Sequence, residues 1–354
     1  MNFEFSGTPP FEHLERLTTS LGIYEHALLH EPRTEHGYCV DDAARALVLL
    51  CREPQLDQTF RKMLDLYLNF TLEAIAEDGA CHNRMDADGL WIDEAGKGDW
   101  WGRASWGLGF AAIHAPEFGQ RSAALLGFRL LSKTTSPDRR AISFAALGAG
   151  EILLEQPDDA RARKILMEAE ARLNEQISPD WFWPETRLGY SNASIAEAAM
   201  LTGLALQHKS VTECGIRMLE FLLSVETRDG HFSPTPVGGR GPGEVEIHFD
   251  QQPIEIAAIA DACARAWTIT GDPRWIAEIE RAWSWFLGDN DVGVAMFDKR
   301  TGAGFDGLHA HGPNQNQGAE STMAMLSTAQ HFYRIYSSKS RAESYNDSAR
   351  FRLT

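Results

Sequence analysis

The chain has 354 residues, a length that suits one large domain or two smaller ones. Its 33 basic and 50 acidic residues give a formal net charge of −17, which argues against a nucleic-acid or anionic-membrane partner because both bind basic surfaces. Hydrophobic residues make up 44% and charged residues 23% of the chain, which excludes disorder over most of its length.

Neither a membrane span nor a secretion signal is predicted. No apolar run reaches transmembrane length, and residues 1–5 lack the basic start and apolar stretch of a signal peptide. The five cysteines are scattered without the spacing of metal ligands, which fits reduced thiols in a cytosol. We therefore expect a cytoplasmic protein with no metal site and no cofactor.

Alanine is abundant and valine scarce, at 44 and 8 residues, and this balance favours helices over sheets. Caps, prolines and apolar residues at helical spacing predict twelve helices. In chain order they are expected to begin near residues 8, 41, 57, 102, 120, 136, 157, 192, 210, 252, 272 and 316. The first is expected to end near Gly22 and the last near Tyr336, and residues 337–354 form a polar tail.

The twelve helices make six hairpins with unequal connections. Segments that lead into even-numbered helices, such as residues 78–102 and 228–252, are long and rich in Gly, Trp, His and charge. The even helices are also richer in Ala and Gly, which suits close packing in an inner ring. We therefore predict an all-α (α/α)6 barrel, with residues 1–336 as one catalytic domain and a cleft where the long loops emerge. An open α-solenoid is the alternative.

Two adjacent acids, Asp41 and Asp42, stand at the start of the second predicted helix. One acid is enough to cap a helix, so the second is surplus to that role. The helix dipole favours the ionised carboxylate, which suits a general base or an acceptor of sugar hydroxyls. Asp42 is accordingly a candidate catalytic residue and Asp41 a candidate substrate contact.

Aromatic and charged side chains follow in the next long loops. Trp101 and Arg103 stand at the start of the fourth predicted helix, where an indole can stack on a sugar face and an arginine can anchor an acidic group or a hydroxyl. Glu185, Tyr190 and Asn192 lie together before the eighth helix. Capping explains Asn192 most simply, but it does not explain Glu185.

The last two long loops supply further candidates. His248 and Asp250 precede the tenth helix, and His309 and His311 precede the twelfth, in whose first turn Glu320 is expected. Each segment alone is explained by capping or core packing. Together they place carboxylates at the starts of four even helices, among Trp, Tyr, Asn, Gln and His side chains, a mixture that suits a polyhydroxylated ligand.

Five motifs carry a resemblance to a known group of proteins. They are Gly37-Tyr38-Cys39-x-Asp41-Asp42-x-Ala44-Arg45-Ala46-Leu47, Trp101-Gly102-Arg103-x-x-Trp106, Tyr190-x-Asn192-Ala193, Asp250-Gln251-Gln252-Pro253-Ile254-Glu255 and Asn316-Gln317-Gly318-Ala319-Glu320-Ser321-Thr322. The set resembles bacterial proteins of the six-hairpin glycosidase superfamily over nearly the whole chain. Ala43 departs from the pattern, in which Asn follows the two Asp.

The resemblance implies a fold and a general substrate. Members of the group are stand-alone proteins or domains joined to glycosyltransferases, and they often accompany enzymes that act on mannosides. It therefore implies an (α/α)6 barrel, an oligosaccharide or monosaccharide substrate that contains mannose, and association with a glycosyltransferase. It also adds Tyr38 and Gln251 to the expected substrate contacts.

Three functional hypotheses follow. The favoured one is a glycoside hydrolase with Asp42 as base and Glu320 as acid, with Asp250 as the next candidate acid. The second is a sugar 2-epimerase or isomerase, which commonly needs His bases on both faces of a carbon next to a carbonyl. The third is a non-catalytic saccharide-binding partner of a glycosyltransferase. The hydrolase requires Asp42, Glu185, Asp250 and Glu320 to converge in one pocket.

Overall fold

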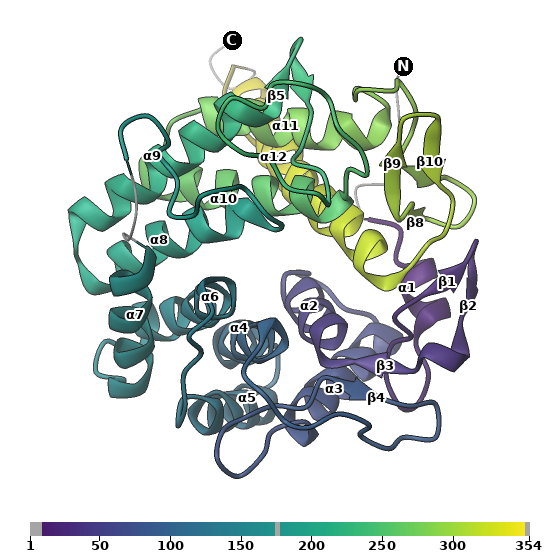
Figure 1. Ribbon diagram of the computed structural model, residues 1–354, viewed down its shortest axis with the longest axis vertical. Helices are drawn as coiled ribbons and strands as arrows, with labels where there is room; N and C mark the ends of the chain where they lie inside the picture. The colour runs from purple at the N-terminus through teal and green to yellow at the C-terminus, as the bar shows by residue number, and fades with distance from the viewer. Residues whose placement is uncertain (1–8, 174–177, 351–354) are drawn as a thin grey trace.

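The computed structural model describes residues 9–173 and 178–350, and of residues 337–350 it describes the backbone only. Within these ranges six alternate helices pack against one another in a closed ring, which Figure 1 views end-on. The ring consists of α2 (Val40–Cys51), α4 (Asp99–His114), α6 (Arg139–Glu155), α8 (Asn192–Leu206), α10 (Pro253–Thr270) and α12 (Ala319–Arg350). Because α12 packs back on α2, the ring is closed, which rules out the open solenoid.

The outer layer consists of the other six helices that the structure describes. Each packs on the inner helix that lies next to it in the chain, except α1, which packs on α12 and so joins the two ends of the chain. The outer helices are α1 (Glu12–Leu17), α3 (Gln58–Glu73), α5 (Phe118–Leu131), α7 (Ala160–Leu173), α9 (Lys209–Glu226) and α11 (Arg274–Leu287). The six hairpins confirm the predicted (α/α)6 barrel.

Short antiparallel strand pairs occupy the long loops, which the all-helical prediction omitted. The pairs are β1 (Ala27–Leu28) with β2 (Glu31–Pro32), β3 (Tyr38–Cys39) with β4 (Arg84–Met85), β5 (Thr227–Arg228) with β6 (His231–Phe232), β7 (Phe297–Asp298) with β8 (Ala303–Gly304), and β9 (Gly307–His309) with β10 (Gly312–Asn314). A single 3-10 turn spans Thr34–His36. Strands of two or three residues are too short for a periodic sequence signal.

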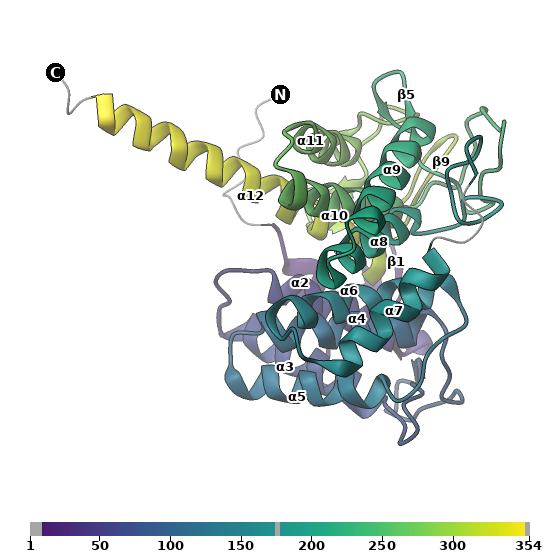
Figure 2. The same cartoon turned by 90° about the vertical axis from the view of Figure 1, so that its left-hand side faces the viewer.

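Helix ends differ from the prediction at both ends of the chain. Helix α1 ends at Leu17 rather than near Gly22, because Thr18 adopts an extended conformation with ψ 135°. Helix α12 continues to Arg350 rather than ending near Tyr336. The sequence of residues 337–350 contains neither Gly nor Pro to stop it. Figure 2 shows this last part of α12 projecting away from the body of the barrel.

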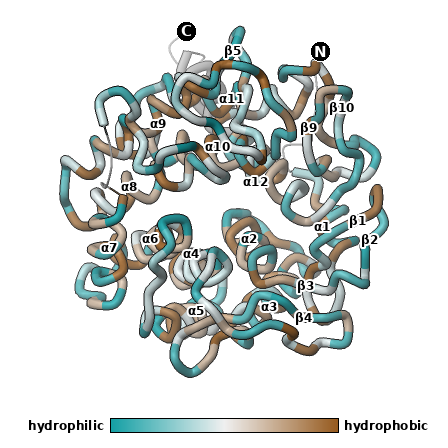
Figure 3. The backbone as a smooth tube through the Cα atoms, viewed as in Figure 1, coloured by the Kyte–Doolittle hydropathy of each residue, from teal (hydrophilic) through white to brown (hydrophobic). Residues whose placement is uncertain are grey.

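Small residues let the inner helices approach closely. A Cβ added at Gly109 on α4 would lie 2.5 Å from the backbone of Gly148 on α6, and one at Gly102 would lie 2.2 Å from the carbonyl oxygen of Ala141. Larger side chains at these positions would separate the two helices. Figure 3 shows hydrophobic residues recurring along the helices, whereas the β9–β10 loop is mainly hydrophilic. No helix in the described ranges combines the length and apolar character needed to cross a bilayer.

Candidate active site

The inner helices all begin at the same end of the ring, because each follows an outer helix that runs the opposite way. Two adjoining cavities lie at this end. The mouth cavity, of about 210 Å³, is lined by Glu25, His26, Cys39, Asp41, Asp42, Arg45, Gln252, Asp306, Gly318, Glu320 and Ser321. The axial cavity, of about 50 Å³, extends inward between the helices, and Arg45 and Glu320 line both cavities.

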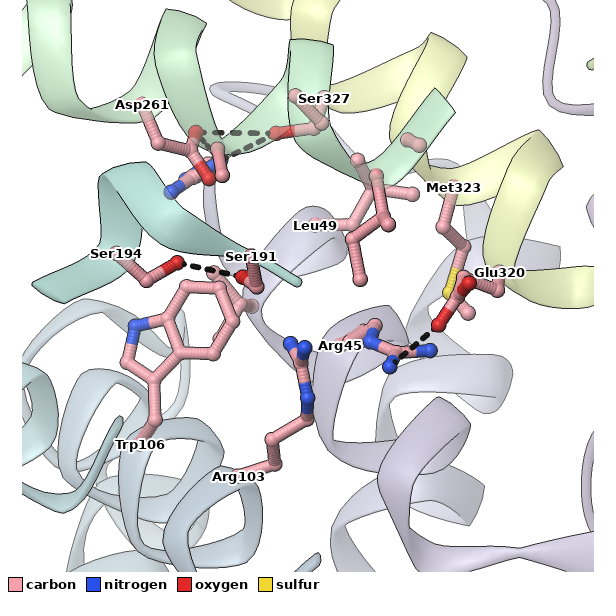
Figure 4. Close-up of a pocket in the computed structure, with 16 residues that line it drawn as sticks. Arg45, Leu49, Arg103, Trp106, Ser191, Ser194, Asp261, Glu320, Met323 and Ser327 are labelled. Carbon is pink, nitrogen blue, oxygen red and sulfur yellow. Dashed lines mark hydrogen bonds and ion pairs between the residues drawn. The ribbon is translucent and has the colours of Figure 1, made fainter. Parts of the chain in front are cut away.

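One arginine gathers three carboxylates at the mouth. The guanidinium of Arg45 on α2 donates to Asp42 Oδ1 at 2.7 Å and to Asp41 Oδ2 at 3.1 Å. It also lies 2.7 Å from Oε2 of Glu320 on α12, an ion pair drawn in Figure 4. Burial opposes the charge of Arg45, but the three anions outweigh it and raise the pKa of the guanidinium. The structure therefore brings together three of the acids singled out in the sequence.

The three carboxylates differ in exposure. The Asp42 residue is only 2% exposed, and its Oδ2 accepts a hydrogen bond from the Cys39 thiol at 3.2 Å. Burial raises the pKa of Asp42 to about 7, against an opposing effect of Arg45. This contradicts the expectation that the helix dipole keeps Asp42 ionised, because loss of hydration exceeds the effect of the dipole. The Glu320 side chain is 40% exposed, so water reaches it directly.

Arg103 on α4 lies beside this group. Its side chain is 3% exposed, its Nε lies 2.8 Å from Asp41 Oδ1, and its guanidinium packs on the Phe144 ring with 3.9 Å to the ring centre. Trp106, one turn further along α4, forms a wall of the axial cavity, where Figure 4 shows the Arg103 guanidinium pointing inward. Arg103, predicted as a substrate contact, thus lines the cavity.

Three other predicted residues form a separate cluster around Arg140 on α6. Glu185 accepts from both terminal nitrogens of Arg140, at 2.7 and 2.9 Å, and Asn192 Oδ1 accepts from Nη2 at 3.2 Å. The Tyr190 hydroxyl donates to Asp99, whose pKa burial raises to about 6. Glu185 lines neither the mouth nor the axial cavity, so the expected convergence of four acids holds for Asp42 and Glu320 but not for Glu185.

Asp250 lies at the edge of the mouth. Its Oδ2 accepts from Gln252, which lines the mouth cavity, at 2.8 Å, and its Oδ1 is 3.8 Å from Nδ1 of His309. Burial raises the pKa of Asp250, and His309 opposes this effect. Asp250 and His309 therefore adjoin the mouth cavity without lining it. His311 and His248 are exposed on loops and line neither cavity.

Three residues predicted as substrate contacts lie in the protein interior. Tyr38 is 1% exposed and stacks on Tyr24 with 4.7 Å between ring centres. Trp101 is fully buried and donates its indole N–H to the Gly79 carbonyl at 3.1 Å. Gln251 is fully buried and donates to Asp291 at 2.6 Å. Because their side chains are enclosed and line neither cavity, their positions indicate packing roles and do not support substrate contact.

Several site residues were not predicted. Arg45 had a signal, because Asp41-Asp42-x-x-Arg45 places the arginine three and four residues after the two acids on one helical face. Asp306 had none: from the loop before α12 it accepts from the Gly318 N–H at 2.7 Å and from the Ser321 hydroxyl at 2.8 Å. These bonds satisfy groups at the start of α12.

Glu255 on α10 was likewise missed as a functional candidate. It is 3% exposed and accepts from the backbone N–H groups of Ser191 and Asn192, so it caps α8 from the neighbouring inner helix. Burial raises the pKa of Glu255 to about 8, and the nearby Glu226 adds to this effect. Its partner lies more than sixty positions earlier in the chain, which no local pattern indicates.

Oxygen and sulfur atoms of Glu25, Cys39 and Asp42 lie within 4.8 Å of one another at the mouth. Glu25 is paired with Arg84, and the Cys39 thiol donates to Asp42, so both groups already have partners.

The sequence also contains the pair Asp86 and Asp88. Asp86 Oδ1 accepts from the N–H groups of Asp88 and Leu90, which is the pattern of a turn.

The sequence matches no protein-family model, and a comparison with curated proteins found no match. Solved structures show a clear likeness. A sugar epimerase from a ruminal bacterium aligns with a TM-score of 0.72 at 12% identity, over 92% of this chain and 95% of that one. The cellobiose 2-epimerase from Spirochaeta thermophila DSM 6192 aligns with a TM-score of 0.65 at 13% identity, over 92% and 94%.

A hydrolase shares the same architecture. The cellulase Cel9M of C. cellulolyticum aligns with a TM-score of 0.58 at 8% identity, over 89% of this chain and 88% of that one. Identities this low establish the fold and do not select among the reactions of these proteins. The chain is thus similar in fold to sugar epimerases and to glycoside hydrolases.

Proposed function

We propose that the protein is a glycoside hydrolase whose active site is the mouth cavity. The observation that carries the proposal is the gathering of Asp41, Asp42 and Glu320 around Arg45 where the inner helices begin. Glycoside hydrolysis needs two carboxyl groups beside the scissile bond, one protonated and one ionised. The mouth cavity supplies a buried and an exposed carboxyl on two neighbouring inner helices, α2 and α12.

The exposure of the two residues assigns their roles. Asp42, with a pKa raised to about 7, is still protonated in a large fraction of molecules near neutral pH and acts as the general acid toward the leaving oxygen. Glu320 is open to water and lies 2.7 Å from Arg45, so we assign it the role of the base that activates water or of the nucleophile. These roles are the reverse of those expected from the sequence, where the helix dipole was the leading consideration.

Asp41 and Arg45 act by position. Asp41 Oδ2 and Glu320 Oε2 are at most about 6 Å apart, because they lie 3.1 and 2.7 Å from the same nitrogen atom of Arg45. Asp41 is partly exposed and faces the cavity, so it is available to accept a hydrogen bond from a sugar hydroxyl. Arg45 holds the three carboxylates at fixed spacing, which a two-carboxyl mechanism requires.

Epimerisation would place paired bases on the two faces of a sugar carbon. Among the described residues that line the two cavities, His26 is the sole histidine, and it is half exposed and 3.7 Å from Glu25. His248, His309 and His311 lie outside both linings. The chemistry of the cavity walls therefore favours hydrolysis over a mechanism based on two histidines.

The test uses a panel of oligosaccharides, with manno-oligosaccharides included because of the sequence resemblance. Asp42→Asn and Glu320→Gln should each reduce turnover by at least about 100-fold. Asp57→Asn, which neutralises an exposed acid at the start of α3 and keeps a capping oxygen, serves as a control that leaves turnover unchanged. Full activity in both active-site variants would refute the assignment.

The same panel separates the other two hypotheses. If deuterium from the solvent enters a reducing sugar and no glycosidic bond is cleaved, the protein is an epimerase and not a hydrolase. Saccharide binding without any turnover would favour a binding module, including one that serves a glycosyltransferase.

A further inference from the structure

The axial cavity contains a buried cation with an incomplete set of partners. Arg103 is 97% buried, and its terminal Nη2 is among the buried atoms without a hydrogen-bond partner in the described residues. The Phe144 ring covers one face of the guanidinium, and Asp41 lies against Nε. The end of the guanidinium that remains is the one that Figure 4 shows pointing into the cavity.

Arg45 provides an internal comparison in the same cleft. Burial lowers the pKa of the Arg45 guanidinium, but the carboxylates around it raise this pKa by more. For Arg103 the balance is reversed, because burial, aided by repulsion from Arg45, exceeds the attraction of Asp41 and lowers the pKa of the guanidinium. Burying an arginine without full compensation is unfavourable, so a further negative group beside Arg103 would stabilise this arrangement.

The space beside Arg103 limits the size of that group. The axial cavity holds about 50 Å³, which accommodates a few water-sized atoms but not a whole sugar ring. Its lining also includes Trp106, Ser191 and Ser194, and the hydroxyls of the two serines bond to each other at 2.8 Å. Arg45 and Glu320 line both this cavity and the mouth cavity, and the sugar ring would lie on the mouth side of these two residues.

We infer that Arg103 binds a carboxylate carried by the sugar, so that the substrates are saccharides that contain a uronic acid. This inference rests on the proposed function, which places the sugar ring in the mouth cavity. The negative charge of the ligand is inferred from the unpartnered end of the Arg103 guanidinium. A carboxylate adds three heavy atoms beyond the ring, which suits the small cavity, and its two oxygens match the paired N–H groups of a guanidinium.

Binding of monosaccharides tests this without relying on turnover. Calorimetric titration at pH 7 would compare D-glucuronate with D-glucose, D-galacturonate with D-galactose, and D-mannuronate with D-mannose. In the wild type at least one uronate should bind about 10- to 100-fold more tightly than its neutral hexose, as expected for a charge-assisted hydrogen bond. Sodium acetate, titrated alone, should bind at least about 10-fold more weakly than that uronate, because it lacks the ring.

Variants then locate the preference. Arg103→Met should reduce the ratio of uronate to hexose affinity to near one while leaving hexose affinity within about 3-fold, and Arg103→Lys should retain part of the ratio. Arg52→Met is the matched control, because Arg52 lines the same cavity but is already paired with Asp261 and Ser327. The control should preserve the ratio.

Two results would overturn the inference. One is a wild-type protein that binds none of the three uronates more tightly than the matching hexose. The other is an Arg103→Met variant that loses uronate and hexose binding equally, since that would assign Arg103 to sugar hydroxyls or to positioning. A uronate preference without hydrolysis would contradict the proposed function alone, and hydrolysis of neutral saccharides without such a preference would contradict this inference alone.

Discussion

The buried carboxyl of Asp42 should make the stability of the protein fall as the pH rises. Asp42 is 2% exposed, and its pKa is about 7 in the folded protein against an ordinary 3.8. In the unfolded chain the carboxyl loses its proton near pH 4, whereas the folded protein retains it until about pH 7. Between these values the folded state binds more protons, so raising the pH favours unfolding. The complete difference corresponds to about 4 kcal/mol.

Asp42→Asn removes the contribution of this carboxyl to the pH dependence of stability, so comparing the variant with the wild type measures that contribution. The free energy of unfolding, obtained from urea titrations between pH 4 and 8.5, should shift by up to about 4 kcal/mol in favour of the variant over this range. The loss of contacts to Arg45 and Cys39 adds an offset, so the change with pH carries the test rather than the value at one pH. Asp57→Asn keeps a side-chain oxygen that can accept from the Phe60 N–H, so this control should stay within about 0.5 kcal/mol of the wild type over the range. Parallel curves for Asp42→Asn and the wild type would refute the reasoning.

Three further predictions concern the other buried charges. Arg45→Met should lower the free energy of unfolding by about 3–5 kcal/mol, because it removes the cation that Asp41, Asp42 and Glu320 share and leaves Arg103 beside Asp41 alone. A loss below about 1 kcal/mol in a urea titration would contradict this. Glu255→Gln keeps acceptors for the Ser191 and Asn192 N–H groups but removes a carboxyl whose pKa burial raises to about 8, so its melting temperature relative to wild type should be higher at pH 9 than at pH 5. At the other end of the ring, burial would raise the pKa of Glu151, but the bonds from His114 and Arg265 outweigh it and lower the pKa to about 2. Glu151→Gln should therefore be destabilising at pH 7 and approach the stability of the wild type as the pH falls from about 4.5 to 2. Melting curves over this pH range check the convergence.

The helical framework could be predicted because its signals are local. Asp57 accepts from the Phe60 N–H at the start of α3, and Pro253 occupies the first turn of α10, as short-range capping rules require. The alternation of short and long connections then indicated which helices form the inner ring. The strand pairs were missed because strands of two or three residues carry no periodic pattern, and because one pair, β3 with β4, joins two separate loops.

The candidate site was predictable where it depends on helix starts and not where it depends on side-chain direction. Asp41, Asp42 and Glu320 meet because inner helices of a closed barrel begin at one end. Trp101 and Arg103 belong to the same motif, but they are two residues apart on α4. In an α-helix this spacing makes their side chains point about 200° apart around the helix axis. One therefore enters the core and the other faces the axial cavity.

Glu185 illustrates a second limit on prediction from sequence. Its carboxylate is taken by Arg140, forty-five residues earlier in the chain, and nothing near either residue indicates the pairing. Burial acts in the same way on Asp42. The helix start that suggested an ionised base was correctly placed, but the depth of the side chain, which sets its pKa, depends on the packing of the whole ring.

The ion pair between Arg45 and Glu320 joins the first inner helix to the last, so the contact that brings the proposed acid and base together also lies where the ring closes. Its two ends nevertheless differ in their environment. Arg45 is nearly buried and holds Asp41 and Asp42 as well, whereas the Glu320 side chain is 40% exposed. An exposed partner contributes about 0–1 kcal/mol to stability, while an unpaired buried one costs several times more. Glu320→Gln should therefore abolish turnover while leaving the stability of the barrel almost unchanged, whereas Arg45→Met should lower stability as well. A large loss of stability in Glu320→Gln would mean that this acid serves to close the ring rather than to catalyse the reaction.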